Sequence, residues 1–190
     1  AAFPSRETER LAALVAPAFP MIRPVGSVLE TVFPYTNAIH HPPAFLCNAG
    51  RCEATGGDYH HYYDGITPSV GRLIDACDRE RLAVAAALGC RPAPLPDHFL
   101  RMGYTTEAAR DSGLAYEVFH QSEADRPIRA PKSLDYRFFT EDVPYGMVPL
   151  SELGRLAGVR TPTIDHTIRL VSVAMARDFR AEGLTLSRMG

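Results

Sequence analysis

The sequence lacks the features that mark membrane-spanning and secreted proteins. No window holds 18 uninterrupted apolar residues, so a membrane-spanning helix is excluded. The N-terminus has no basic region followed by an apolar stretch, so we expect no signal peptide and a cytoplasmic protein. The four cysteines form no CxxC pair and are expected to be reduced thiols.

The chain also lacks the short motifs that identify many enzymes. It contains no GxGxxG, no GxxxxGK[ST], no HExxH and no GxSxG. It therefore carries no nucleotide-binding fingerprint of its own. The first residue is Ala1 rather than a methionine, which indicates a piece of a longer protein.

An excess of positive charge is absent too. The 190 residues include 20 basic and 22 acidic side chains, a net charge of −2, which argues against nucleic acid as a partner. Lys132 is the lone lysine, and arginine is the better clamp for a carboxylate. Hydrophobic residues make up 46% of the chain, enough for the core of one domain with a small appendage.

Helical periodicity dominates from residue 67 onward. Thr67-Pro68 is typical of a helix start, and the apolar spacing predicts a helix of about 21 residues that ends at Gly89. Its charged residues 78–81 are predicted to face solvent. Apolar and polar residues alternate only in part over residues 27–33, so the sequence gives little evidence for strands. Further helices are predicted over residues 5–16, 106–121 (weakened at Gly113), 151–157, and from Thr161-Pro162 to about Arg177.

Polar residues suited to chemistry gather in two segments, 35–43 and 136–146. In the first, Pro42 and Pro43 directly follow His41, which predicts an extended backbone with the histidine at a rigid turn. Asn37 lies four residues earlier. The second segment places an arginine and two carboxylates among aromatic residues. Taken alone, each segment is more often a surface turn or a surface ion pair.

Together these segments resemble the octopine/nopaline (opine) dehydrogenases. The resemblance rests on NAIHHPP (37–43), LCNAGR (46–51), HYYDGITPSVGRLIDACDRERLAVAAALG (61–89), RFFTEDVP (137–144) and MVPLSELGRLAGVRTPTID (147–165). It covers the chain from about residue 28 to its end. It implies a mainly α, bundle-like domain of the opine dehydrogenase / 6-phosphogluconate dehydrogenase C-terminal type, with a short non-helical N-terminal segment.

The resemblance also implies a domain organisation. Members of this family have a Rossmann domain for NAD(P), followed by a helical catalytic domain. Residues 1–26 would be the tail of the nucleotide-binding domain or a linker, and residues 27–190 the helical domain. NAD or NADP would then bind mainly to a domain that this chain does not contain, and a homodimer is possible.

The implied reaction is the reductive condensation of an amino acid with a 2-oxo acid. His41 would be the general acid/base and Asp142 its carboxylate partner. Arg137 would bind a substrate carboxylate, and Asn37 would help to hold the substrates. Apart from the resemblance, the position of Tyr104 between two predicted helices makes it a further candidate to face the substrate. These roles suit the chemistry, because imine formation needs proton transfers near neutral pH and both substrates are carboxylates.

The pairing of His41 with Asp142 has a geometric test. One ring nitrogen of His41 should lie roughly 3 Å from an Asp142 oxygen. The other nitrogen should face an open cleft, with Arg137 on the same wall. His40 is expected to point elsewhere, residues 60–63 to form an aromatic turn packed on the long helix, and Glu141 to be structural or solvated.

Two other classes of function remain open. One is a non-catalytic helical module of the same fold, used for oligomerisation or ligand binding, which would be expected to lose His41 or Asp142. The other is a metal-binding protein that uses His40, His41, His60 and His61. Neighbouring histidines on an extended backbone diverge, so the second class is the weaker alternative.

Overall fold

The computed structural model describes residues 1–188, and within them the protein is built from helices. These residues form no strand, and their β-type pairing is limited to an isolated antiparallel bridge between His60 and Arg129. The α-helices are α1 (Thr8–Val15), α2 (Leu29–Val32), α3 (Asn37–Cys47), α4 (Ala49–Thr55), α5 (Pro68–Ala87), α6 (Leu95–Arg101), α7 (Glu107–Ser112), α8 (Ala115–His120), α9 (Arg137–Thr140), α10 (Val148–Leu156), α11 (Pro162–Ala174) and α12 (Phe179–Glu182). The shorter turns are η1 (Ser5–Glu7), the π-helical η2 (Val143–Met147) and η3 (Leu186–Arg188).

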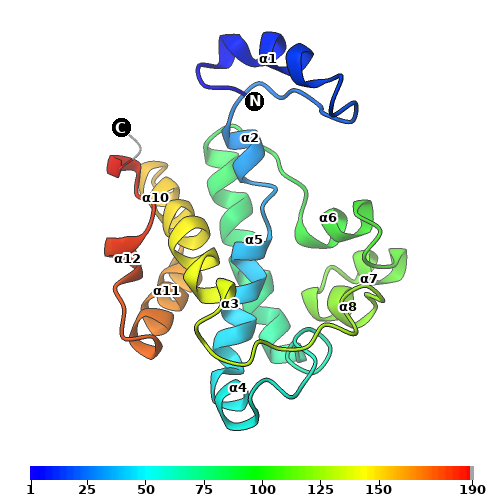
Figure 1. The fold of residues 1–190 in the computed structure, drawn as a ribbon, viewed down its shortest axis with the longest axis vertical. Coiled ribbons are helices and arrows are strands. Elements are labelled where there is room, and N and C mark those ends of the chain that lie inside the picture. Colours follow the sequence, from blue (N-terminus) through cyan, green and yellow to red (C-terminus); the bar gives the residue numbers. More distant parts are fainter. Residues whose placement is uncertain (189–190) are drawn as a thin grey trace.

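Helices α3 and α5 form the centre of the molecule, with α10, α11 and α12 on one side and α6, α7 and α8 on the other (Figure 1). Helix α3 packs against α5, α9, α11 and η2, so apolar side chains surround it. The core between these elements includes Phe33, Ile39, Phe45, Ile74, Val84, Phe139 and Ile168, each almost without exposure. None of the helices within residues 1–188 is both long enough and apolar enough to cross a bilayer.

The strongest local signals of the sequence are confirmed. Helix α5 has 20 residues, begins at Pro68 and is followed by Gly89, which adopts the left-handed conformation (φ 77°) that glycine tolerates best. Helix α11 begins at Pro162, as predicted. The predicted helix over residues 106–121 is two helices, because Gly113 (φ 68°) ends α7 before α8 begins.

The predicted extended backbone at Pro42 and Pro43 is wrong. Both prolines lie inside α3, which runs through them to Cys47. A proline within a helix removes a backbone hydrogen bond and costs about 3 kcal/mol. The burial of residues 38–45 among four neighbouring elements offsets this cost. The helix places Asn37 one turn before His41 on the same face.

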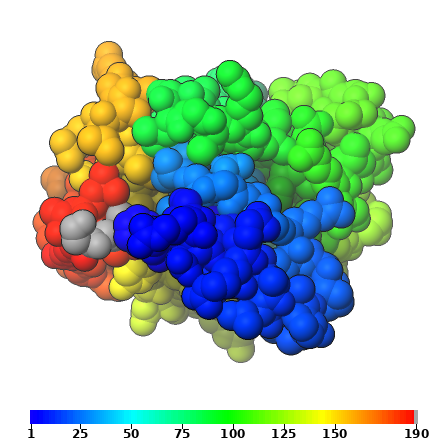
Figure 2. Space-filling model, turned by 90° about the horizontal axis from the view of Figure 1, so that it is seen from above, coloured from blue at the N-terminus to red at the C-terminus, as the bar shows by residue number. Residues whose placement is uncertain are grey.

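At the front of the chain one prediction is confirmed and one is wrong. Residues 27–33, whose strand signal is weak, contain the short helix α2. The helix predicted over residues 5–16 is present, since η1 and α1 cover Ser5–Val15, so the expected non-helical N-terminal segment is partly helical. Seen from above, this segment lies across one end of the molecule (Figure 2).

The predicted solvated face at residues 78–81 is wrong for two of its members. Asp78 and Arg81 are 6% and 1% exposed and form a buried ion pair within α5. Arg81 also donates to the carbonyls of Phe33 (2.5 Å) and Ala93 (2.8 Å), while Asp78 accepts from the Leu95 N–H (2.9 Å). This pair therefore ties the two segments that flank α5 to the helix.

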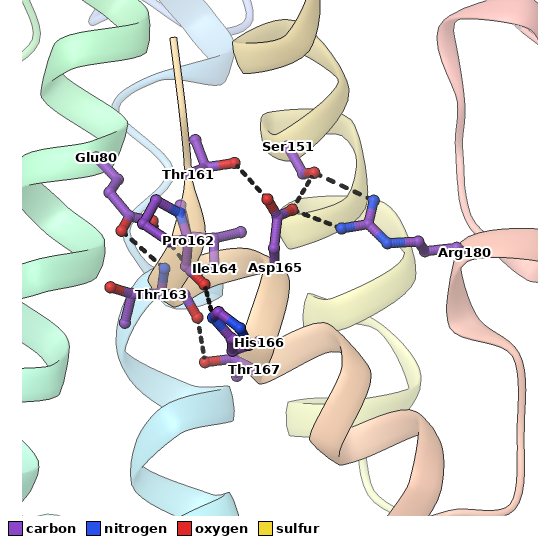
Figure 3. A network of polar contacts seen from close by, with 10 residues as sticks. All are labelled: Glu80, Ser151, Thr161, Pro162, Thr163, Ile164, Asp165, His166, Thr167 and Arg180. Carbon is purple, nitrogen blue, oxygen red and sulfur yellow. Dashed lines mark hydrogen bonds and ion pairs between the residues drawn. The ribbon is translucent and has the colours of Figure 1, made fainter.

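Glu80, the third residue of that face, caps a different helix. Its carboxylate accepts from the N–H groups of Thr163 (2.8 Å) and Ile164 (3.0 Å) at the start of α11 (Figure 3). Within the same network Asp165 accepts from the Ser151 hydroxyl at 2.6 Å and pairs with Arg180. The network joins α5, α10, α11 and the C-terminal segment: Arg180 pairs with the Asp165 carboxylate, and backbone N–H groups hold that of Glu80.

Candidate functional site

His41 and Asp142 lie together in the core, although 101 positions separate them in the sequence. The His41 Nδ1 atom is 2.8 Å from the Asp142 Oδ2 atom. His41 projects from the middle of α3, and Asp142 stands at the junction between α9 and η2. The side chain of Asp142 has no exposure and that of His41 has 7%. The predicted separation of roughly 3 Å is confirmed.

The second nitrogen of His41 does not face an open cleft, so this part of the expectation is wrong. The Nε2 atom is 2.7 Å from the hydroxyl of Tyr62, which is buried. The remaining oxygen of Asp142 accepts a hydrogen bond from the hydroxyl of Tyr35. A continuous chain of hydrogen bonds thus links Tyr62, His41, Asp142 and Tyr35.

The chemistry of these groups sets the direction of each bond. An ionised Asp142 only accepts hydrogen bonds, so Nδ1 of His41 carries the proton and donates it. In the neutral ring Nε2 is then an acceptor, and the hydroxyl of Tyr62 donates to it. Burial, with the Arg137 guanidinium nearby, holds the pKa of the His41 imidazole well below its usual range, consistent with a neutral ring.

Two further histidines surround His41. The ring of His40 lies 4.3 Å from that of His41, between centroids, and packs against Phe99 and Phe119. The ring of His61 packs at a tilt against that of Phe138, with 4.6 Å between centroids. Burial lowers the pKa of both histidines, that of His61 to about 3.

Three nitrogens of this cluster have no hydrogen-bond partner among the described residues: Nδ1 of His40 and both ring nitrogens of His61. Orphan buried polar atoms are rare in folded proteins and costly. We therefore treat His40, His41, His61, Tyr62, Tyr35 and Asp142 as one group, the histidine cluster.

Arg137 lies at the edge of this cluster. It opens α9, its side chain is 54% exposed, and its guanidinium is 2.9 Å from Glu141. Its charge adds to the effect of burial in lowering the pKa of the His41 imidazole. Glu141 is therefore a surface ion-pair partner, in line with its expected structural or solvated role.

The other predicted site residues lie in different settings. Asn37 is half-buried at the start of α3. Tyr104 is 42% exposed between α6 and α7, where it touches the edge of Phe99. A pocket of about 300 Å³ lies beside Tyr35, lined also by Ala38, Arg81, Tyr145, Gly146 and Leu150.

Sequence reasoning missed the roles of Tyr62 and Tyr35 in this site. Tyr62 was expected to pack on the long helix as part of an aromatic turn, whereas its hydroxyl contacts His41. No local pattern distinguishes it from Tyr63, which is 39% exposed and packs against His120. Only the position of each ring relative to α3 separates the two residues.

The described residues offer no nucleotide cradle and no metal centre. No strand leads into a glycine-rich turn and a helix in residues 1–188, which is the geometry that holds a pyrophosphate. No group of three or more His, Cys, Asp or Glu side chains in this part of the chain is arranged to hold a metal ion. His60 pairs with Asp64 rather than joining the other histidines.

Comparison with protein families gives one match over most of the chain. Residues 24–175 match the family described as NAD/NADP octopine/nopaline dehydrogenase, alpha-helical domain. An opine dehydrogenase of Arthrobacter sp. (strain 1C) is 40% identical over 166 residues, which is 87% of this chain and 45% of the relative. A vitopine synthase of Allorhizobium ampelinum is 27% identical over 160 residues, 83% of this chain and 42% of the relative.

Solved structures give the same fold. Octopine dehydrogenase in a complex with NADH and L-arginine superposes with a TM-score of 0.68 at 21% identity, over 89% of this chain and 45% of that one. A complex of octopine dehydrogenase with NADH and agmatine gives a TM-score of 0.66. The mainly helical fold expected from the sequence is confirmed. The chain spans about half the length of these relatives.

Proposed function

We propose that this chain, which belongs to the octopine/nopaline dehydrogenase family as its alpha-helical domain, supplies the acid/base and carboxylate-binding groups of an opine-forming oxidoreductase. The reaction would be the NAD(P)H-dependent reductive condensation of an amino acid with a 2-oxo acid. The observation that carries this proposal is the buried His41, held neutral against Asp142, with an unprotonated Nε2 that accepts a hydrogen bond from the Tyr62 hydroxyl.

His41 would perform the proton transfers of imine formation. Nε2 removes a proton from the substrate ammonium group, which frees the amine lone pair to attack the carbonyl carbon of the 2-oxo acid. The imidazolium that results is stabilised by Asp142 at 2.8 Å. It delivers this proton to the carbonyl-derived oxygen, giving a hydroxyl group. His41 then carries a second proton from the carbinolamine nitrogen to that hydroxyl, which leaves as water when the C=N bond forms.

Arg137 would bind the carboxylate of a substrate. Its guanidinium is exposed and already holds a carboxylate, that of Glu141, at 2.9 Å. A planar substrate carboxylate offers the same two acceptors in the geometry that a guanidinium matches. Asn37, one helical turn before His41, would add hydrogen bonds to the substrate, and we place Tyr104 at the outer edge of the site.

The dinucleotide does not fit the residues of this chain, so a second domain would hold it. A bound nicotinamide would supply the hydride, and the helical domain would supply the positions and proton transfers. Residues 1–26 would form the connection to that domain, and residues 27–190 the helical unit. Whether NAD or NADP is used depends on contacts outside this chain.

The test is a coupled assay on an enzyme in which this chain follows a nucleotide-binding domain. Oxidation of NADH or NADPH is followed with panels of amino acids and 2-oxo acids, and the N-(carboxyalkyl) product is identified by mass spectrometry. We expect turnover only when both substrates are present. His41→Asn should reduce kcat by about 10²- to 10⁴-fold, the usual contribution of a general acid or base.

His60→Asn is the matched control for that variant. His60 is also a histidine of the central segments, but it pairs with Asp64 and its side chain is 40% exposed. We expect its kcat to stay within a factor of about two, because His60 lies outside the histidine cluster. Full turnover of His41→Asn would contradict the proposal and favour the non-catalytic helical module.

A further inference from the structure

The hydrogen bond from Tyr62 to His41 occupies the nitrogen that the proposed reaction needs. Nδ1 of His41 is engaged by Asp142, so proton exchange with a substrate must use Nε2. The hydroxyl of Tyr62 lies 2.7 Å from Nε2. Tyr62 therefore holds the place that a substrate N–H would take.

Several contacts fix the hydroxyl of Tyr62 at this place. Its ring stacks on Phe119 with 5.3 Å between centroids and an interplanar angle of 11°. The preceding His61 N–H donates to the Ile128 carbonyl at 2.9 Å, and the Tyr62 carbonyl accepts from Ile66 at 3.0 Å. Tyr62 is thus held by both its ring and its backbone.

The turn that carries Tyr62 is also tied to the helix that carries His41. The Asn48 side chain donates to the Ala44 carbonyl of α3 at 2.8 Å and to the Gly65 carbonyl at 2.9 Å. A Cβ at Gly65 would lie 2.2 Å from the His61 carbonyl, so the turn requires glycine there. The relative position of Tyr62 and His41 is therefore part of the fold and not a chance contact between mobile side chains.

We infer that Tyr62 is a positioning residue for the proposed reaction: its hydroxyl keeps Nε2 of His41 unprotonated in the free enzyme and yields this atom to the substrate amine. This inference rests on the proposed function for its enzymatic meaning. A hydrogen bond donated to the neutral form of a histidine favours that form. Tyr62 thus opposes Asp142, which favours the imidazolium.

The other titratable groups that face His41 remain in place when the Tyr62 hydroxyl is removed. They come from α3, from the segment around residue 61, from α9 and from the start of η2: His40, His61, Arg137 and Asp142. Tyr35 reaches the group through its hydrogen bond to Asp142. Tyr62→Phe keeps the stacked ring and removes only the donor. A change in the titration of His41 in this variant is therefore assigned to the lost hydrogen bond.

The first experiment uses the 190-residue chain labelled with ¹⁵N-histidine. In the unaltered chain at pH 7, His41 should show a protonated Nδ1 and an unprotonated Nε2. In Tyr62→Phe the onset of imidazole protonation should move upward by about 0.5–1 pH unit, the size of one neutral hydrogen bond. Tyr63→Phe, on the neighbouring exposed ring, should leave the titration of His41 unchanged.

The second experiment uses the active enzyme and separates positioning from packing. The pH profile of kcat/KM reports the free enzyme, and that of kcat reports the substrate complex. In Tyr62→Phe the acid limb of kcat/KM should move to higher pH, while the acid limb of kcat stays in place because the substrate has already replaced the phenol. Tyr63→Phe should move neither limb.

Three results would overturn the inference. A protonated Nε2 in the unaltered chain would do so even if Tyr62→Phe did not fold. An unchanged His41 titration in a folded Tyr62→Phe would reduce the role of Tyr62 to packing. Parallel shifts of both limbs would show that the phenol stays in place when substrate binds. Absence of any opine-forming turnover would instead contradict the proposed function and leave the ¹⁵N result standing.

Discussion

Two buried aspartates pair with nitrogen-containing side chains, Asp78 with Arg81 and Asp142 with His41. The two pairs differ in how many of the polar atoms in and around them have hydrogen-bond partners. Asp78 and Arg81 make an ion pair whose remaining polar atoms bind the backbone at Phe33, Ala93 and Leu95. Asp142 and His41 share their surroundings with two histidines that contain orphan nitrogens. The first pair connects segments of chain, whereas the second holds a titratable ring in a defined protonation state.

This difference indicates where the fold favours function over stability. A buried ion pair that is fully hydrogen-bonded is a structural element whose disruption costs several kcal/mol. Buried imidazoles without partners cost free energy in the folded state and give no packing advantage over phenylalanine. A cluster that retains two such imidazoles, with three orphan nitrogens, around one hydrogen-bonded histidine is better explained by chemistry than by stability.

The largest effects are expected when the aspartate of each pair is replaced by asparagine. Asp142→Asn should lower kcat by about 10²- to 10⁴-fold, because an amide N–H facing Nδ1 would force the proton of His41 onto Nε2. Asp78→Asn should instead lower the free energy of unfolding by about 3 kcal/mol, because it leaves the Arg81 charge buried without its counter-ion.

Kinetics of the active enzyme and urea unfolding of the chain measure these two effects separately. Asp142→Asn should lose much less stability than Asp78→Asn, and folded Asp78→Asn should keep its kcat. If both variants lost activity and stability in equal proportion, the division between a structural and a chemical pair would be wrong.

Local sequence signals predicted the parts of the fold whose causes are local. The Thr-Pro starts of α5 and α11 and the stop at Gly89 depend on backbone conformation within a few residues, and they were predicted correctly. Pro42 was misinterpreted because its backbone restriction is outweighed by packing on four elements from elsewhere in the chain.

The candidate site also combines features that could be predicted from the sequence with features that depend on packing between distant segments. The pairing of His41 with Asp142 followed from resemblance to a family and not from spacing, since 101 positions separate the two residues. The contacts of Tyr62 and the burial of Asp78 depend on which side of a helix meets its neighbours. The composition of these segments does not contain that information, so both were missed.

A second prediction concerns the stability of the protein at acidic pH and depends on the histidine cluster. Burial lowers the pKa of His40, His41 and His61 in the folded state, whereas the unfolded chain titrates near the ordinary value of 6.5. Below pH 6.5 the unfolded state therefore binds more protons, and stability falls with falling pH. Each histidine should contribute about 1.4 kcal/mol per pH unit.

Urea unfolding of the chain at pH 7.5, 6.5, 5.8 and 5.0 tests this dependence. For three histidines the free energy of unfolding should fall by about 1 kcal/mol between the first two values and by about 3 kcal/mol between the last two. Burial raises the pKa of the Asp142 carboxyl, which opposes the loss toward the acid end. A flat profile down to pH 5 would contradict the neutral buried imidazoles.

A third prediction compares the two arginines. Arg137→Lys should raise KM for a carboxylate substrate at least tenfold, about 1.4 kcal/mol, because an ammonium group lacks the two-pronged geometry of a guanidinium. Arg81→Lys should leave KM unchanged in the folded enzyme and lower its stability, because the carbonyls of Phe33 and Ala93 lose donors. An unchanged KM in Arg137→Lys would make Arg137 a partner of Glu141 alone.

The smallest expected effect concerns His61, whose ring packs against Phe138 and whose two nitrogens have no partner among the described residues. His61→Phe keeps a flat ring at this place and removes two buried polar atoms, a gain that the larger ring partly offsets by tighter packing. We expect the free energy of unfolding at pH 7.5 to rise by less than about 1 kcal/mol. The acid slope should fall by the share of one histidine. A loss of more than about 2 kcal/mol would mean that the nitrogens of His61 hold a buried water, and Nδ1 of His40 would then be the one orphan nitrogen left in the histidine cluster among the described residues.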